Sequence, residues 1–195
     1  MISDIEIHRR IFHLINGIII VGLIYYNILD YIIAIILLVL LLMLGLVVKR
    51  ARVPMASWFF EKFDRPKDFR RLPGKGSVFY LLGVILVLLL FPKDIAMASI
   101  IIMTLGDSIA PIIGQYGGIE NPFNKKKYIE GSIGGGLIAF LGAMLFVSAW
   151  EAALASFAAM IAEGITLKKG INPLDDNIIM PLVAGGVIWL LRIIL

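Results

Sequence analysis

The sequence contains no cysteine and only two histidines, His8 and His13. Without thiols the chain can form no disulfide, use no thiol nucleophile and build no thiolate metal site. Two histidines are also too few for a histidine-rich metal site. Charged residues make up 16% of the chain, whereas 60% of its residues are hydrophobic and the mean hydropathy is +0.96. The hydrophobic share and the mean hydropathy exceed those of soluble domains, and the charged share is lower. We therefore expect an integral membrane protein surrounded by lipid, with no nucleic-acid partner.

Two further absences bear on the organisation of the chain. The first apolar run has no small-residue cleavage signature and leads straight into a second run, so we expect no removable signal peptide. Neither a domain-scale repeat nor a low-complexity tail is visible. Residues 1–195 are therefore expected to form one polytopic membrane domain.

Apolar stretches of nearly the length needed to cross a bilayer, about 20 residues, recur along the chain. The sequence predicts an all-α protein with about seven transmembrane helices. Their expected ranges are 11–27, 30–48, 76–92, 95–115, 132–149, 151–165 and 177–195. The connections after the first, third and fifth of these are very short, which predicts antiparallel helical hairpins.

Basic residues are distributed unevenly between the two sides of this predicted topology. The side that carries the N-terminus collects 16 of the 18 lysines and arginines, and only Lys93 and Arg192 fall on the other. The positive-inside rule then makes the N-terminus cytoplasmic and places the C-terminus outside. We expect the cell membrane of a prokaryote or a membrane of the endoplasmic-reticulum type, with the active site on the cytoplasmic face.

The loop between the second and third predicted spans, residues 49–75, is rich in large apolar side chains. Pro54 and Pro66 bound an amphipathic segment that is predicted to lie in the membrane interface. It can be a surface anchor or a gate for a lipid substrate. Its apolar side chains are Met55, Trp58, Phe59, Phe60 and Phe63.

The stretch LGDSIAPIIGQYGG places a carboxylate, Asp107, inside an otherwise apolar predicted span. Ionised groups in the membrane are costly, and they usually face a wet cavity or a partner. Pro111 has no N–H, so the Asp107 carbonyl loses its helical partner and a kink is expected there. Gly114 and Gly117 would then allow a turn or the close approach of a ligand. The alternative is a buried aspartate that only pairs with an arginine.

The N-terminal stretch EIHRRIFHLING carries a polar stripe at helical spacing, from Glu6 to His13. A polar stripe that enters a membrane helix must face protein or water. Arg9 and Arg10 are suited to bind a phosphate or a lipid headgroup, because a guanidinium can donate to two oxygens at once. The two arginines can also serve only to set the topology.

The loop YGGIENPFNKKKYIEGSIGGG combines three lysines with a glycine-containing helix start. Free amides and the helix dipole make such a start a natural phosphate site. The Walker pattern is absent, so no soluble P-loop fold is implied. We predict a nucleoside triphosphate site here and in the preceding glycine turn. The candidate residues are Lys125, Lys126, Lys127, Glu130, Gly131, Ser132, Gly114 and Gly117.

Acidic residues near the C-terminal end are expected on the same face as Asp107. Mg²⁺ prefers carboxylates together with substrate phosphates, so a magnesium site is predicted. One aspartate or asparagine of the run 175–177 can instead cap the last helix. The candidate ligands are Asp107, Glu130, Glu163 and Asp176.

Four stretches in order resemble the membrane-bound CTP-dependent lipid kinases, that is, dolichol kinase, phytol kinase and the yeast-type diacylglycerol kinase. They are Glu6 to Gly17, Gly106 to Gly118, Lys125 to Gly135 and Glu163 to Gly185. The resemblance implies transfer of the γ-phosphate of a nucleoside triphosphate, typically CTP, to a lipid alcohol. It also implies that the nucleotide binds through the KKKYIEGS loop. Eukaryotic dolichol kinases carry extra N-terminal spans, so this chain looks like a minimal catalytic core.

We therefore expect a kinase of a polyisoprenoid alcohol of the dolichol or polyprenol kind, with Asp107 as metal ligand or catalytic base. A kinase specific for phytol or diacylglycerol is an alternative. So is a cytidylyltransferase that makes a CDP-lipid, although the KD…PGHGG…DR.D pattern of phosphatidate cytidylyltransferases is absent. A small transporter would fit an intramembrane aspartate, but no inverted repeat is visible. Small membrane enzymes often dimerise, so a homodimer is possible.

Overall fold

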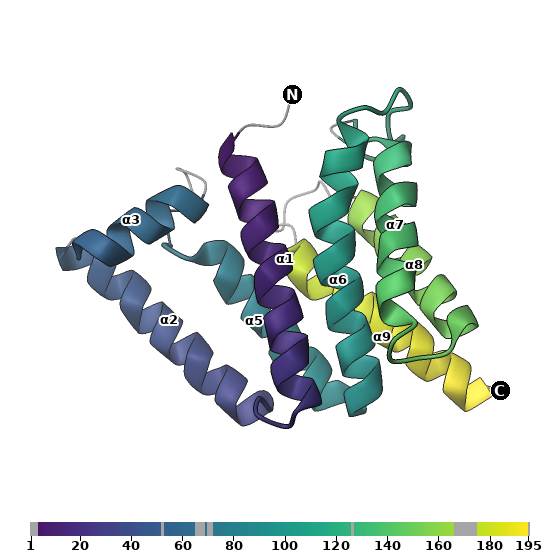
Figure 1. Cartoon of the computed structure of the whole chain (residues 1–195), viewed down its shortest axis with the longest axis horizontal. Helices are drawn as coiled ribbons and strands as arrows, with labels where there is room; N and C mark the ends of the chain where they lie inside the picture. The colour runs from purple at the N-terminus through teal and green to yellow at the C-terminus, as the bar shows by residue number, and fades with distance from the viewer. Residues whose placement is uncertain are drawn as a thin grey trace.

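The computed structural model describes residues 4–51, 53–64, 69, 72–125, 127–165 and 175–194. These residues form helices joined by turns, and their only β-type pairing is an isolated antiparallel bridge between Glu120 and Tyr128. The predicted all-α class is confirmed (Figure 1). The helices are α1 (Asp4–Tyr25), α2 (Tyr31–Ala51), α3 (Pro54–Phe63), α5 (Lys75–Leu90), α6 (Lys93–Gly114), α7 (Ile129–Ala143), α8 (Ala149–Gly164) and α9 (Asp176–Ile194).

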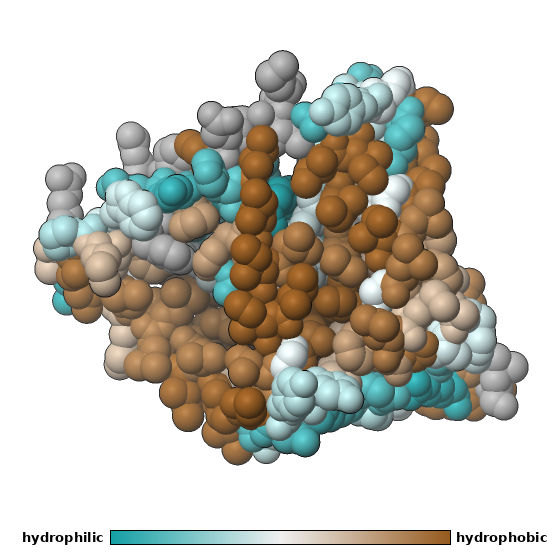
Figure 2. Space-filling view, viewed as in Figure 1, coloured by the Kyte–Doolittle hydropathy of each residue, from teal (hydrophilic) through white to brown (hydrophobic). Residues whose placement is uncertain are grey.

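Each predicted membrane range contains a helix, but the helices differ in length. Four of them, α1, α2, α6 and α9, are long and apolar enough to cross a membrane. The other three are shorter, with 16 residues in α5, 15 in α7 and 16 in α8. In Figure 2 a broad brown apolar region covers the middle of the visible face, and polar residues gather at its upper and lower edges. This arrangement is that of an integral membrane protein.

A short turn joins the first two helices, which diverge from it (Figure 1), and this turn is tied to the start of α6. Asn27 in the turn adopts a left-handed conformation with φ of 57°, which asparagine tolerates better than most residues. The Lys93 ammonium donates to the Tyr25 carbonyl at 2.9 Å and to Asn27 Oδ1 at 2.6 Å. Asp30 then caps α2, because its Oδ1 accepts the Ile33 amide at 2.9 Å. The short connection predicted at this position is confirmed, but the expected antiparallel hairpin is not, because α1 packs mainly on α6 and α2 mainly on α5.

Helix α6 is the centre of the bundle. Most of its residues are buried, and it packs against α1, α7, α8 and α9. Its approach to α7 is so close that a Cβ at Gly131 would lie 2.4 Å from the Ala110 carbonyl oxygen. Only glycine fits at this crossing. The carboxylate Asp107 therefore stands on the most enclosed element of the fold.

An ionic network joins α6, α8 and α9 at the end of the bundle where α6 begins. Arg192 donates to Glu151 Oε1 and to Asp94 Oδ2, both at 2.6 Å. Glu151 also closes a capping box with Ser148, whose amide and hydroxyl lie 2.9 and 2.6 Å from Glu151 Oε2. Asp94 and Asp107 are separated by about 20 Å along the axis of α6. This network therefore lies far from Asp107 and holds the opposite end of the bundle together.

The interfacial segment predicted between the second and third spans contains a helix, α3, which starts at Pro54 as expected. It ends at Phe63, and the predicted boundary at Pro66 lies outside the described residues. The Phe63 ring packs against Phe12 of α1 with 4.7 Å between the ring centroids. This contact favours the anchoring role over the gating role for α3.

Candidate active site

The backbone of α6 at Asp107 lacks one helical hydrogen bond, and a side chain from α1 replaces it. The helix continues through Pro111 to Gly114, so the proline leaves the Asp107 carbonyl without its usual N–H donor. Arg10 donates one guanidinium N–H to this carbonyl and contacts the Asp107 carboxylate with the same nitrogen. One arginine thus satisfies both the backbone and the side chain of Asp107.

Glu6 fixes this arginine from the other side. Its carboxylate contacts the Arg10 guanidinium at 3.0 Å and the Arg9 guanidinium at 2.7 Å. The Arg10 side chain is 12% exposed and that of Arg9 is 25% exposed. Of the two candidate phosphate ligands, Arg10 is therefore held against Asp107, while Arg9 lies nearer the surface.

His13 lies one helical turn from Arg10 on the same face of α1. Its Nε2 is 4.0 Å from Asp107 Oδ2 and is buried with no hydrogen-bond partner among the described residues. The imidazole packs edge-on against Tyr80 of α5, with 4.8 Å between ring centroids. The Tyr80 hydroxyl is 3.2 Å from the Thr104 hydroxyl of α6. Sequence reasoning missed Tyr80 and Thr104, because each stands singly in an apolar run and forms no pattern.

The connection between α6 and α7 folds back on itself and positions Lys127. The Asn121 amide donates to the Lys127 carbonyl at 2.9 Å, and the Ile129 amide donates to the Ile119 carbonyl at 2.9 Å. Asn121 also packs against Gly164, the last residue of α8, where a Cβ would lie 2.7 Å from the asparagine Nδ2. The loop is thereby docked onto the end of α8.

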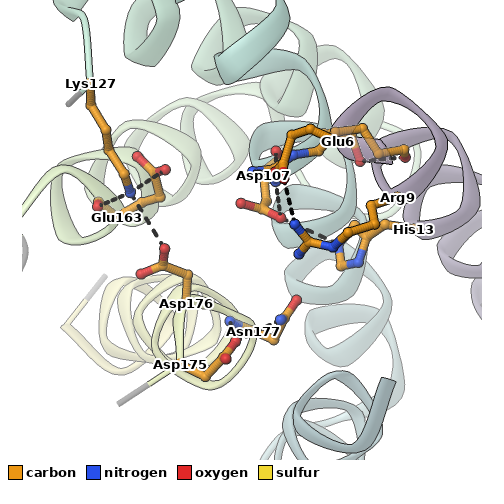
Figure 3. Close-up of polar contacts among 11 residues, drawn as sticks. Glu6, Arg9, His13, Asp107, Lys127, Glu163, Asp175, Asp176 and Asn177 are labelled. Carbon is orange, nitrogen blue, oxygen red and sulfur yellow. Dashed lines mark hydrogen bonds and ion pairs between the residues drawn. The ribbon is translucent and has the colours of Figure 1, made fainter. Parts of the chain in front are cut away.

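Lys127 reaches two acidic residues of α8 and α9. Its ammonium contacts the Glu163 carboxylate, donates to the Glu163 carbonyl at 2.6 Å and lies 3.4 Å from Asp176 Oδ2. The Glu163 side chain is 4% exposed, and its Oε2 is buried without a hydrogen-bond partner in the described part of the chain. Figure 3 shows this group on one side of Asp107 and the residues of α1 on the other.

Three carboxylates from α6, α8 and α9 converge at this point. One carboxylate oxygen each from Asp107, Glu163 and Asp176 lies within 4.8 Å of the others. Oxygens bound to one Mg²⁺ at 2.0–2.1 Å lie about 3–4 Å apart, so a small adjustment of these side chains would fit the ion. The unsatisfied Glu163 Oε2 is a further acceptor in this cluster. The donor set is therefore suited to a hard divalent cation.

The polar residues 175–177, at the start of α9, have different partners. Asp175 Oδ1 accepts the Asn177 amide at 3.1 Å and the Asn177 side chain at 2.6 Å. Asp175 thus caps α9, and Asp176 is left to face Lys127. The capping alternative for this run is realised by Asp175.

Glu130, the fourth predicted metal ligand, has other partners in the structure. Glu130 accepts the Gly118 and Ile119 amides at 2.8 and 3.0 Å, and it is not among the converging carboxylates. Hydrogen bonds from its own amide and from those two amides hold the pKa of the Glu130 carboxyl below its ordinary value. A Cβ at Gly117 would lie 2.7 Å from Glu130 Oε2, which explains that glycine.

The start of α7 serves packing as well. Gly131 faces Ala110, Gly114 lies against Gly131, and the Ser132 amide donates to the Tyr128 carbonyl at 3.3 Å within the helix. Lys125 is exposed, and Lys126 lies outside the described residues. The Ser132 amide is therefore already used.

Fold and site together define a helical membrane protein with a cluster of ionisable side chains at one end of its bundle. Comparison with known proteins shows which proteins this chain is similar to. No family model and no solved structure match the chain. Over 185 residues, or 94% of the chain, it is 27% identical to an uncharacterized protein of Methanocaldococcus jannaschii, of which it spans 92%.

Two further relatives carry a named activity. Over 135 residues, 60% of the chain, it is 31% identical to a probable chloroplastic phytol kinase of Triticum aestivum. Over 134 residues, also 60% of the chain, it is 27% identical to a CTP-dependent diacylglycerol kinase of Schizosaccharomyces pombe. The chain spans 44% of the plant protein and 60% of the yeast protein. The predicted resemblance to the CTP-dependent membrane lipid kinases is confirmed.

Proposed function

We propose that this protein is a kinase that transfers the γ-phosphate of CTP to a membrane polyisoprenoid alcohol at the cytoplasmic face. The observation that supports this most directly is the convergence of three carboxylates between two cations, Arg10 and Lys127. Phosphoryl transfer requires in-line positioning and neutralised charge more than covalent chemistry, and a metal ion held by these carboxylates would supply neutralising charge. The similarity to phytol kinases and to a CTP-dependent diacylglycerol kinase supports the same class of reaction.

In the proposed reaction the lipid hydroxyl oxygen forms a bond to the γ-phosphorus. The bond between that phosphorus and the oxygen bridging to the β-phosphate breaks, CDP leaves, and the hydroxyl proton passes to a base. Asp107 is the candidate base, and it is equally placed to be a metal ligand. Asp107, Glu163 and Asp176 would hold Mg²⁺, which neutralises phosphate charge when it is bound. We leave Glu130 out of this set because its carboxylate binds loop amides.

The cationic residues are assigned to the phosphates. Lys127 is close to the acidic cluster, and Lys125 and Lys126 belong to the same loop. Arg9, on the more exposed part of α1, is proposed to bind the phosphates or the lipid headgroup, together with Arg10 and His13. A seven-span topology with the N-terminus in the cytoplasm would place all these groups on one side, next to the soluble nucleotide.

The decisive experiment follows two labels through one reaction. The purified protein in detergent with Mg²⁺ receives CTP labelled at either the α- or the γ-phosphate, with ATP in parallel. The acceptors are dolichol, geranylgeraniol, phytol and diacylglycerol. We expect the γ-label in the lipid, CDP as the other product, and the highest rate with an isoprenoid alcohol.

Each other outcome has a definite meaning. Transfer of the α-label to a phospholipid acceptor with release of pyrophosphate would identify a cytidylyltransferase instead. Preference for phytol or diacylglycerol would keep the kinase and correct the acceptor. Absence of transfer of either label, with protein shown to be folded, would refute the proposed reaction. Loss of transfer on adding a chelator, restored by Mg²⁺, is the result expected for the proposed metal.

A further inference from the structure

The Lys127 ammonium contacts two of the three carboxylates that a divalent cation would use as ligands. It contacts the Glu163 carboxylate and lies 3.4 Å from Asp176 Oδ2, and these two residues are two of the three proposed metal ligands. A metal ion bound to the same oxygens would lie within a few ångströms of this ammonium. Two cations so close to each other in a largely buried site, where water screens them little, repel each other strongly.

The net charge of the cluster also disfavours a free metal ion while Lys127 is in place. Asp107, Glu163 and Asp176 carry three negative charges, and Arg10 and Lys127 carry two positive ones. With both cations in place only one negative charge remains to attract a free metal ion. If Lys127 withdraws, two negative charges remain, which match one divalent cation.

Of the two cations, Lys127 is the one able to withdraw. Arg10 is held by the Asp107 carboxylate, the Asp107 carbonyl and Glu6, and its side chain is 12% exposed. Lys127 also has three contacts, with the Glu163 carboxylate, the Glu163 carbonyl and Asp176, but its side chain is 26% exposed and has a flexible four-carbon stem. Its loop is also the one proposed to bind the triphosphate, so a nucleotide would offer the ammonium a new anionic partner nearby.

We infer that Lys127 acts as a resident cation that keeps free divalent metal out of the carboxylate cluster until a nucleotide draws it away. The site then selects the metal–nucleotide complex over the metal alone. Lys127 is in this view a specificity-determining residue with two successive partners, the carboxylates and then the phosphates. The inference rests on the proposed function, because it requires both the metal site and the nucleotide.

The test measures Mn²⁺ binding to the full-length protein in detergent, by the electron paramagnetic resonance signal of free Mn²⁺, with and without CTP. After subtraction of the Mn²⁺ that CTP binds in the absence of protein, the wild-type protein should bind Mn²⁺ at least about tenfold more tightly when CTP is present, and this gain should be smaller in Lys127→Met, where no ammonium competes. Lys127→Met should bind Mn²⁺ without CTP at least about tenfold more tightly than wild type, for the same reason. Adding Glu163→Gln to Lys127→Met should abolish this gain.

Two control variants separate the position of the charge from the charge itself. Lys127→Arg keeps a cation at the cluster and should exclude free Mn²⁺ as wild type does. Lys125→Met removes a charge from the exposed part of the same loop and should not increase Mn²⁺ binding in the absence of CTP. Thermal unfolding of each variant shows whether it is folded, and CTP without protein gives the amount of Mn²⁺ that the nucleotide itself binds.

The possible failures are distinguishable. If wild type binds Mn²⁺ equally well with and without CTP, the inference about Lys127 is wrong and the metal site stands. The same holds if folded Lys127→Met gains no affinity for Mn²⁺. If no variant binds Mn²⁺ even with CTP, the proposed metal site is wrong, and the inference is wrong with it.

Discussion

The replacement of a missing helical hydrogen bond by Arg10 can be tested by a double-mutant cycle with Pro111. In the native chain Pro111 offers no N–H to the Asp107 carbonyl, and Arg10 donates to that carbonyl instead. Pro111→Ala restores a backbone donor at the same place. Arg10→Met removes the side-chain donor while keeping much of the apolar volume of the arginine. The two substitutions should therefore be strongly coupled.

The expected coupling follows from what each variant leaves unsatisfied. With Pro111 present, Arg10→Met strands a buried carbonyl, at about 1–3 kcal/mol, and breaks a largely buried ion pair, at about 3–5 kcal/mol. In the Pro111→Ala background the carbonyl has its helical partner again, so only the ion-pair cost remains. The loss of stability caused by Arg10→Met should thus be about 1–3 kcal/mol smaller in that background than in the native one.

The measurement is reversible unfolding of the four proteins in mixed micelles, followed by helical circular dichroism as the fraction of denaturing detergent rises. Arg9→Met is the matched control, because Arg9 contacts Glu6 in α1. Its effect should be the same in the native and the Pro111→Ala backgrounds. If Arg10→Met and Pro111→Ala are additive to within about 0.5 kcal/mol, the carbonyl contact carries no energy and our interpretation is wrong.

Three further predictions concern the two ends of the bundle. Asp107→Asn should reduce phosphoryl transfer at least about 100-fold. The control Asp94→Asn, at the far end of α6, should leave the catalytic rate close to normal. Near-normal transfer by Asp107→Asn would refute the mechanism. Glu151→Ala should destabilise the protein by about 2–4 kcal/mol, because a capping box and a charged hydrogen bond are lost together, and a thermal unfolding shift equivalent to less than about 0.5 kcal/mol would contradict this. Because the folded-state pKa of Glu130 is lowered, its stabilisation of the loop should be complete above its unfolded pKa of about 4.3 and be lost as the pH falls through the lowered value. Hydrogen exchange at the Gly118 amide should follow this loss in wild type, and Glu130→Gln should show no such pH dependence.

The helices could be predicted because apolar runs of membrane length have few alternatives to helix in a lipid environment. Helix α3 could be predicted for a different reason, since proline, here Pro54, is favoured at the start of a helix. Helix lengths were less predictable. The range 132–149 corresponds to α7, which ends already at Ala143 because the chain turns before the capping box at Ser148, whereas the range 151–165 agrees closely with α8.

Individual residues of the site could be predicted from the sequence, but their pairing could not. A proline four residues after Asp107 predicts that the Asp107 carbonyl lacks its helical donor. Nothing in the sequence pattern indicates that Arg10 rather than Arg9 supplies the donor. That choice depends on the rotation of α1 against α6. Likewise the run at 175–177 contains three capable caps, and only the three-dimensional position of Lys127 leaves Asp176 for the cluster. The predicted roles of these residues in binding and catalysis stay predictions.

The same side chains that we assign to the reaction also make the resting protein possible. Three carboxylates gathered at the end of a membrane bundle would repel one another and resist burial unless cations accompanied them. Arg10 and Lys127 meet this need in the resting protein, and they do so with different strengths of attachment. The more firmly held cation is bound to the backbone at the proline, so it preserves the geometry of Asp107. The more loosely held one is on the loop that should meet the nucleotide. In the proposed scheme the metal–nucleotide complex then neutralises the carboxylates in place of Lys127, so they do not repel one another.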